Sequence, residues 1–127
     1  MESTSGTTVL CVEDEDLQLH CRKQLFESAG FRVLGARTGA EAVELFRSNE
    51  VALVVLDYWM AGMNGLAVAT ELKRLRPRTP IIVLSGLASL PGETIGLVDA
   101  WFQKAKVEPE QLLDEATRLV RQGLQSN

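Results

Sequence analysis

The chain has 127 residues, 46% of them hydrophobic and 24% charged, which is the size and composition of a single globular domain. Its net charge of -4 is too negative for a domain that neutralises nucleic-acid phosphates, so we expect no direct nucleic-acid binding. Residues 1–16 contain five acids and no Lys or Arg, so negative charge is concentrated there. No apolar stretch has the length of a membrane span or the pattern of a signal peptide, so we expect a cytoplasmic protein without membrane contact.

Short apolar runs, each bounded by Gly, Pro, Asn or acidic residues, predict five β-strands. They lie at residues 9–12, 31–34, 51–56, 81–84 and, more weakly, 100–102. Two of the runs, 51–56 and 81–84, are uninterrupted, which is typical of parallel strands that are buried on both faces. Apolar residues at helical spacing predict helices between the strands, around residues 17–29, 42–46, 66–75 and 112–120. The alternation predicts one doubly wound α/β domain with a five-stranded parallel sheet.

Residues that favour helix ends agree with this pattern. Gly30 is expected to close the first helix, and Thr38 and Asn64 to cap the second and third. Pro109 suits the first turn of the last helix. Gly and Pro residues interrupt the helical pattern between 86 and 99, which predicts a short or irregular fourth helix. We place the domain at residues 8–122, with short tails at 1–7 and 123–127.

The two cysteines have neither metal-ligand spacing nor a disulfide framework around them. Cys11 lies in an apolar run and Cys21 in a helical pattern, so both are interpreted as small core residues. The single histidine, His20, is expected on the solvent side of the first helix.

Polar side chains follow four of the predicted strands. Glu13 and Asp14 follow the first strand, and Asp57 follows the third. Ser85 follows the fourth strand, and Lys104 comes just after the fifth. Because ligands of an open parallel sheet bind beyond the carboxyl ends of its strands, we expect these groups to converge. Three carboxylates repel one another unless a cation lies among them, and oxygen ligands without His or Cys favour Mg²⁺. Asp57, fixed at the end of a buried strand, is placed as a nucleophile for attack on phosphorus.

Motifs in five segments support this interpretation by their order and spacing. The segments are 9–15 with the acidic pair, 29–31 with Gly30, 53–66 around Asp57, 80–86 with Ser85, and 101–104 with an aromatic and a lysine. Together they resemble the response-regulator receiver domains of two-component signalling, over about residues 8 to 121. The resemblance implies a flavodoxin-like sheet with the strand order 2-1-3-4-5.

The resemblance also implies a metal site and a phosphorylated residue. Asp57 corresponds to the phosphoacceptor of the family. Glu13, Asp14, Asp57 and the backbone carbonyl of Trp59 correspond to the ligands of Mg²⁺, which is the expected cofactor.

Other positions correspond to the groups that bind the phosphoryl oxygens and respond to them. Ser85 and Lys104 fall where the family contacts these oxygens, and Ser85 and Trp101 fall where it has its switch residues. The chain departs from the pattern at Ala61 and Ala105, where the family usually has proline, and the interval from Ser85 to Lys104 is a few residues short. Because a cis bond before a residue other than proline is costly, we expect a trans peptide between Lys104 and Ala105.

We therefore expect a phosphorelay receiver that takes phosphate from a histidine kinase or a histidine phosphotransfer protein and signals to an unknown downstream protein. It would catalyse only its own phosphorylation and a slow dephosphorylation. We expect the dephosphorylation to be slow because the side chains of Trp59 and Leu87, which flank the expected approach of the attacking water, cannot orient that water. One alternative is a phosphohydrolase with an aspartyl nucleophile, but this needs a second acid where Trp59 stands. Another alternative is a receiver-like protein-binding module that signals independently of phosphorylation.

Overall fold

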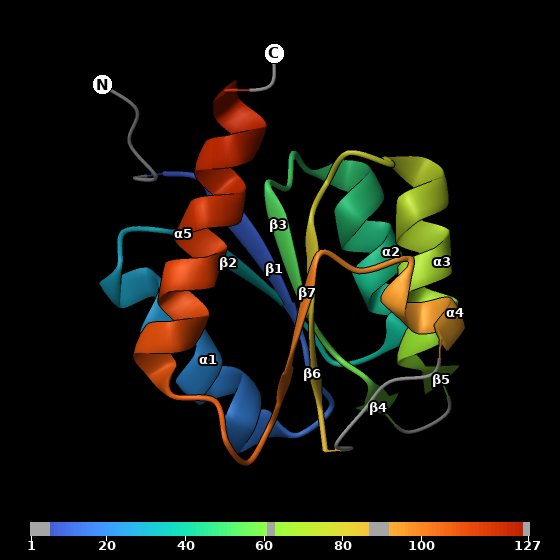
Figure 1. Cartoon of the computed structure of the whole chain (residues 1–127), viewed down its shortest axis with the longest axis horizontal. Coiled ribbons are helices and arrows are strands. Elements are labelled where there is room, and N and C mark those ends of the chain that lie inside the picture. The colour runs from blue at the N-terminus through green and yellow to red at the C-terminus, as the bar shows by residue number, and fades with distance from the viewer. Residues whose placement is uncertain (1–5, 61–62, 87–91, 126–127) are drawn as a thin grey trace.

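A parallel sheet of five strands forms the centre of the protein (Figure 1). The computed structural model describes residues 6–60, 63–86 and 92–125. In chain order, the strands of the sheet are β1 (Thr8–Val12), β2 (Arg32–Ala36), β3 (Leu53–Asp57), β6 (Ile81–Ser85) and β7 (Ala100–Gln103). They lie side by side in the order β2-β1-β3-β6-β7 and pair in parallel. This arrangement confirms the expected order 2-1-3-4-5.

Helices cover both faces of the sheet (Figure 1). One face carries α1 (Asp16–Ser28) and α5 (Pro109–Gln125). The other face carries α2 (Gly39–Ser48), α3 (Gly65–Leu75) and the short α4 (Gly92–Ile95). The expected doubly wound α/β architecture is therefore confirmed. None of the helices in the described ranges is long and apolar enough to cross a membrane.

The central strand β3 is buried on both sides. Val54 and Leu56 pack into the core on the α2–α3 side, whereas Leu53 and Val55 pack into the core on the α1–α5 side. Each of these four side chains is fully buried. Burial on both faces explains why this run is uninterrupted in the sequence, and it holds the last residue of the strand, Asp57, on a rigid support.

Most of the predicted helix ends are found in the structure. Gly30 follows α1 with a φ of 94°, a conformation that glycine adopts without steric cost. The hydroxyl of Thr38 caps α2 by accepting a hydrogen bond from the backbone N–H of Glu41 at 3.0 Å. Pro109 is the first residue of α5, which continues to Gln125, beyond the expected end of the domain at 122. The fourth helix has four residues, which confirms that it is short.

The apolar residues that indicated α1 do not all face the core. Leu17 is 68% exposed and Cys21 is also exposed, so the interpretation of Cys21 as a core residue is wrong. The buried residues of the helix are Leu19 and Phe26, and between them lies Arg22, whose side chain is only 9% exposed. A charged residue on the inward face interrupts the apolar spacing, so hydrophobic periodicity alone misplaced Leu17 and Cys21.

The other two residues that the sequence assigned to core or surface lie as expected. Cys11 is buried, and burial raises the pKa of its thiol to about 12, so it is an inert core residue. His20 is exposed on α1.

A short antiparallel ribbon connects the central strand to α3. It consists of β4 (Trp59–Met60) and β5 (Met63–Asn64), and two-residue strands give too little alternation to be recognised in a sequence. Asn64 directly precedes α3 but pairs with Trp59 in this ribbon. The backbone N–H of Gly65 donates to the carbonyl of Tyr58, and a Cβ at position 65 would lie 2.7 Å from the Tyr58 Cα. Only glycine fits at this close approach.

Candidate functional site

The polar residues predicted to converge do so at the carboxyl edge of the sheet. Asp57 and Ser85 are the last residues of β3 and β6, which are neighbouring strands. Glu13 directly follows β1, and Lys104 directly follows β7. Asp57 pairs in register with Leu84, so Ser85 stands one residue farther along the adjacent strand. The parallel order of the sheet thus brings side chains that are up to 91 residues apart in the chain to one place.

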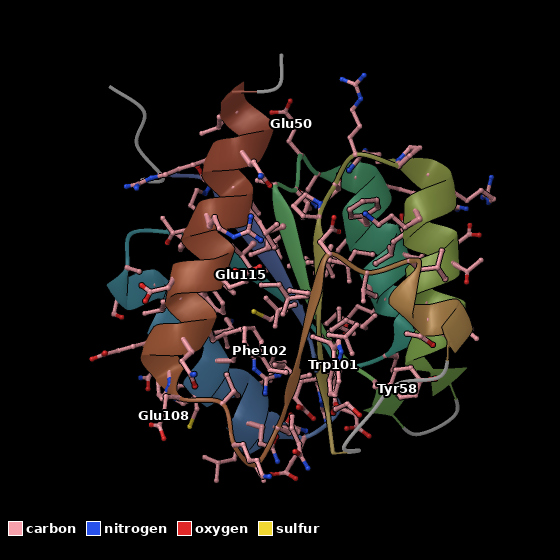
Figure 2. All side chains as sticks on the ribbon, in the orientation of Figure 1. Glu50, Tyr58, Trp101, Phe102, Glu108 and Glu115 are labelled. Carbon is pink, nitrogen blue, oxygen red and sulfur yellow. The ribbon has the colours of Figure 1, made fainter. Side chains whose placement is uncertain are left out.

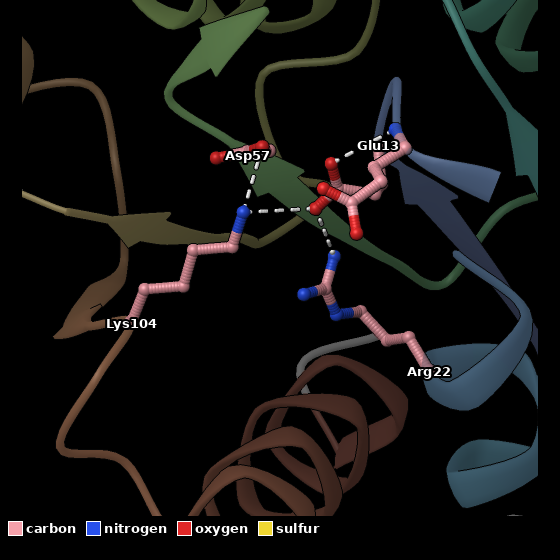
Figure 3. A network of polar contacts seen from close by, with 5 residues as sticks. Glu13, Arg22, Asp57 and Lys104 are labelled. Atoms are coloured by element: carbon pink, nitrogen blue, oxygen red, sulfur yellow. Dashed lines mark hydrogen bonds and ion pairs between the residues drawn. The ribbon is translucent and has the colours of Figure 1, made fainter. Parts of the chain in front are cut away.

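Lys104 is the centre of the contacts at this edge (Figure 3). Its Nζ donates to Asp57 Oδ2 at 3.0 Å and to Glu13 Oε1 at 3.0 Å. Its backbone N–H donates to the carbonyl of Ser85, so the turn after β7 is attached to the end of β6. The lysine is therefore fixed at its backbone while its ammonium group bridges two carboxylates.

Glu13 is almost completely buried, with 1% of its surface exposed. Its Oε1 accepts from Arg22 Nη1 at 3.3 Å in addition to Lys104, and its Oε2 accepts from the backbone N–H of Glu15 at 3.2 Å. Figure 3 shows Arg22 reaching this carboxylate from α1, on the side opposite Asp57. Arg22 has no recognisable motif in the sequence, although its position three residues after the buried Leu19 and four before the buried Phe26 would have indicated the inward face.

Burial and neighbouring charges set the electrostatics of the two buried carboxyls. The pKa of Asp57 is raised to about 6, mainly by burial. The negative charge of Glu13 also raises this pKa, whereas the hydrogen bond from Lys104 lowers it. Burial also acts to raise the pKa of Glu13, but hydrogen bonds from Lys104 and the Glu15 N–H hold it below its ordinary value. Burial acts to lower the pKa of Lys104, but its bonds to Asp57 and Glu13 outweigh this and raise it. Asp57 is therefore the more basic of the two carboxylates.

The carboxylates of Glu13, Asp14 and Asp57 have the composition and spacing of a metal site. One oxygen from each lies within 4.8 Å of the oxygens from the other two. Glu13 and Asp57 are buried, whereas Asp14 is half-buried. A partly accessible set of oxygen donors fits the preference of Mg²⁺, which keeps several water ligands.

The remaining predicted site residues lie around this cluster. Ser85 is fully buried at the end of β6. Trp59 begins β4, two residues after Asp57. Trp101 is half-buried on β7 and packs on the α2–α3 side of the sheet, whereas its neighbour Phe102 packs on the α1–α5 side (Figure 2). The peptide bond after Lys104 is trans, as expected. Ala61 and Leu87 lie outside the described residues.

A comparison with protein families accounts for this arrangement. The model of the response regulator receiver domain matches residues 9–98, which is most of the chain. The chain belongs to this family. Receiver domains are the phosphorelay components of two-component systems, so the resemblance expected from the sequence is confirmed.

Relatives of the receiver domain occur in larger proteins. The autoinducer 1 sensor kinase/phosphatase LuxN of Vibrio campbellii is 39% identical over 84 residues, which are 66% of this chain and 10% of LuxN. The transcriptional regulatory protein SrrA of Staphylococcus aureus is 38% identical over 77 residues, which are 61% of this chain and 32% of SrrA. The chain thus spans about a tenth to a third of the length of these two relatives.

Solved receiver domains have the same fold. A CheY-like receiver domain protein from Methanospirillum hungatei has a TM-score of 0.89 and 25% identity, and the match covers 97% of this chain and 100% of the other. The response regulator TrrA from Thermotoga maritima, solved in complex with Mg²⁺ and BeF, has a TM-score of 0.83 and 26% identity. That match covers 89% of this chain and 98% of TrrA.

Proposed function

We propose that this receiver domain, which we place at residues 8–122, accepts a phosphoryl group on Asp57 from a histidine kinase or a histidine phosphotransfer protein. The observation that carries the proposal is the bridge from Lys104 Nζ to both Asp57 Oδ2 and Glu13 Oε1. An ammonium group that bridges two carboxylates can stabilise negative charge as this charge moves from one carboxylate onto a bound phosphoryl group.

Asp57 has the properties of the nucleophile. It ends a strand that is buried on both faces, so its carboxylate is held in one position for in-line attack. Only 4% of the residue is exposed, which limits competition from water. Its raised pKa of about 6 leaves it ionised at neutral pH and more basic than an ordinary aspartate.

The transfer balances with a phosphohistidine as the donor. A carboxylate oxygen of Asp57 attacks phosphorus in line with the P–N bond, and an acyl phosphate forms as this bond breaks. The electron pair of the broken bond stays on the imidazole nitrogen of the donor. Hydrolysis later returns the carboxylate and releases inorganic phosphate. The domain therefore catalyses only its own phosphorylation and dephosphorylation.

The acidic cluster would hold Mg²⁺. Glu13, Asp14 and Asp57 supply closely spaced oxygens, and the backbone carbonyl of Trp59 is a fourth candidate ligand. Bound Mg²⁺ supplies positive charge beside the phosphoryl oxygens during transfer. The TrrA complex with Mg²⁺ and BeF supports this assignment by similarity.

Ser85 and Lys104 would bind the other phosphoryl oxygens and start the response. Lys104 Nζ exchanges Asp57 Oδ2 for a phosphoryl oxygen, and the Ser85 hydroxyl donates to another. Both residues adjoin β7, because Ser85 pairs with Gln103 of this strand and Lys104 directly follows it. The half-buried Trp101 on that strand would then change its packing, and a downstream protein would bind the altered surface.

Phosphorylation by phosphoramidate, followed by intact-protein mass spectrometry, tests the proposal. The parent should gain the mass of one phosphoryl group only when Mg²⁺ is present, and Asp57→Asn should gain none. Asp16→Asn is the matched control, because Asp16 carries the same charge at an exposed position and pairs with Arg37 at the surface. A folded parent that stays unmodified in Mg²⁺ would favour the phosphorylation-independent binding module, and a phosphorylated Asp57→Asn would exclude Asp57 as the acceptor.

A further inference from the structure

Arg22 is a buried cation at the edge of the acidic cluster, and the family resemblance assigns it no role. Its guanidinium lies 3.3 Å from Glu13 Oε1, the same oxygen that accepts from Lys104. With 9% of the Arg22 side chain and 1% of the Glu13 side chain exposed, the pair is shielded from water and salt. Charge interactions at such a depth are stronger than at a protein surface.

The two cations of the site differ in their contacts and exposure. Lys104 contacts Glu13 and Asp57 at once, so it can keep Glu13 and exchange Asp57 for a phosphoryl oxygen. Arg22 extends from α1, and it lines an apolar groove between this helix and the start of α5, together with Leu25, Leu112 and Lys104 itself. The Arg22 side chain is 9% exposed and contacts Glu13, whereas the Lys104 side chain is 27% exposed and contacts Asp57 as well. Of the two cations, Lys104 is therefore the one that adjoins the acceptor, and Arg22 lies behind Glu13.

The charges of the site follow from these contacts. Glu13, Asp14 and Asp57 are three negative charges, and Lys104 and Arg22 offset two of them, so the free site carries a net charge of one negative unit. Binding of Mg²⁺ reverses this sign. A dianionic phosphoryl group on Asp57 replaces the single charge of the carboxylate, so it adds one negative unit and makes the Mg²⁺-bound site neutral. Without Arg22, the phosphorylated site with Mg²⁺ would keep one uncompensated negative charge.

We propose that Arg22 is a positioning residue that sets the charge of the site, weakening the binding of Mg²⁺ to the free domain and stabilising the phosphoryl group in the Mg²⁺-bound domain. It acts through Glu13 and its electrostatic field without touching phosphorus. This inference rests on the proposed function, because it requires Asp57 to carry the phosphoryl group.

Replacing Arg22 by Met separates this role from a merely structural one. Methionine keeps an apolar stem in the groove and removes the charge. Because one unit charge acting over several ångströms at a partly buried site contributes about 1 kcal/mol, Mg²⁺ should bind about tenfold more tightly to the variant, and beryllium fluoride at saturating Mg²⁺ about three- to tenfold more weakly. If Arg22 only supported the structure, its replacement would loosen Glu13 and weaken the binding of both Mg²⁺ and beryllium fluoride. The opposite signs of the two changes are therefore diagnostic.

Calorimetry with Mg²⁺ alone, and fluorine NMR with beryllium fluoride at saturating Mg²⁺, measure the two affinities. Arg22→Gln gives the same charge change with a hydrogen-bond donor retained, so it should match Arg22→Met and serves if the methionine variant does not fold. Arg22→Lys keeps the charge and should restore both affinities. Lys23→Met removes the same charge from the next residue of α1, whose stem lies against Gly35 of β2, and should leave both affinities near those of the parent.

The outcomes distinguish the two proposals. A parent that binds neither Mg²⁺ nor beryllium fluoride would overturn the proposed function and this inference with it. If the parent binds both Mg²⁺ and beryllium fluoride, the role of Arg22 can be tested separately. Arg22→Met and Arg22→Gln variants that bind the two ligands more weakly, or with unchanged affinity, would overturn that role alone. A Lys23→Met that reproduces the shifts would also overturn it, because the effect would then be one of overall charge.

Discussion

Replacing Asp57 by Asn should stabilise the fold at neutral pH when Mg²⁺ is absent. The buried carboxylate lies beside the negative Glu13, and burial raises its pKa from 3.8 to about 6. A carboxyl with a raised pKa binds its proton more tightly in the folded state than in the unfolded state. The stability that this protonation contributes is complete below about pH 4 and is lost as the pH rises through about 6. The shift of about two units, which already includes the favourable bond from Lys104, corresponds to at most about 3 kcal/mol lost at pH 7.

Urea unfolding of the parent and of Asp57→Asn between pH 4 and 8 measures this contribution. At pH 7.5 the variant should be more stable by about 1 to 3 kcal/mol, and the difference should shrink as the pH falls towards 4. Adding Mg²⁺ should stabilise the parent more than the variant, because the cation compensates the carboxylate that the variant lacks. A variant that is no more stable than the parent at pH 7.5, or a difference that does not depend on pH, would refute the reasoning.

Three further predictions concern the surroundings of the site. Gly65→Ala should destabilise the domain by about 1 to 3 kcal/mol in urea unfolding, because its Cβ would lie 2.7 Å from the Tyr58 Cα; a neutral effect would show that the close approach relaxes freely. Trp59→Asn combined with Leu87→Glu should shorten the lifetime of the phosphorylated domain, measured by mass spectrometry after removal of the donor, and an unchanged lifetime would place control of the water elsewhere. Trp101 fluorescence in Trp59→Phe should change on addition of beryllium fluoride with Mg²⁺, and an unchanged spectrum would exclude Trp101 from the response.

The sequence was most informative at the ends of the strands. Parallel strands place their carboxyl ends at one edge, so polar residues after separate apolar runs, such as Asp57 and Lys104, could be predicted to meet without knowledge of any distance. The buried runs themselves gave the strand positions to within a few residues. Fold and site were predictable for the same reason, since the site is a consequence of strand order.

Hydrophobic spacing failed where a charged residue replaces an apolar one. Arg22 occupies the inward face of α1 because Glu13 is buried beside it, and this pairing is a tertiary contact that no local pattern reveals. The sequence also predicted that a divalent cation would relieve the repulsion among the carboxylates. The structure adds that Lys104 and Arg22 already relieve part of it, which depends on side-chain positions rather than on spacing.

The most direct test of the central claim is chemical identification of the phosphorylated residue. After reaction with phosphoramidate and Mg²⁺, borohydride reduces an aspartyl phosphate to homoserine, and peptide mass spectrometry locates the converted position. The account predicts homoserine at position 57, with aspartate intact at positions 14 and 16. Conversion at another acid, or phosphate retained on His20 with Asp57 unreduced, would contradict it.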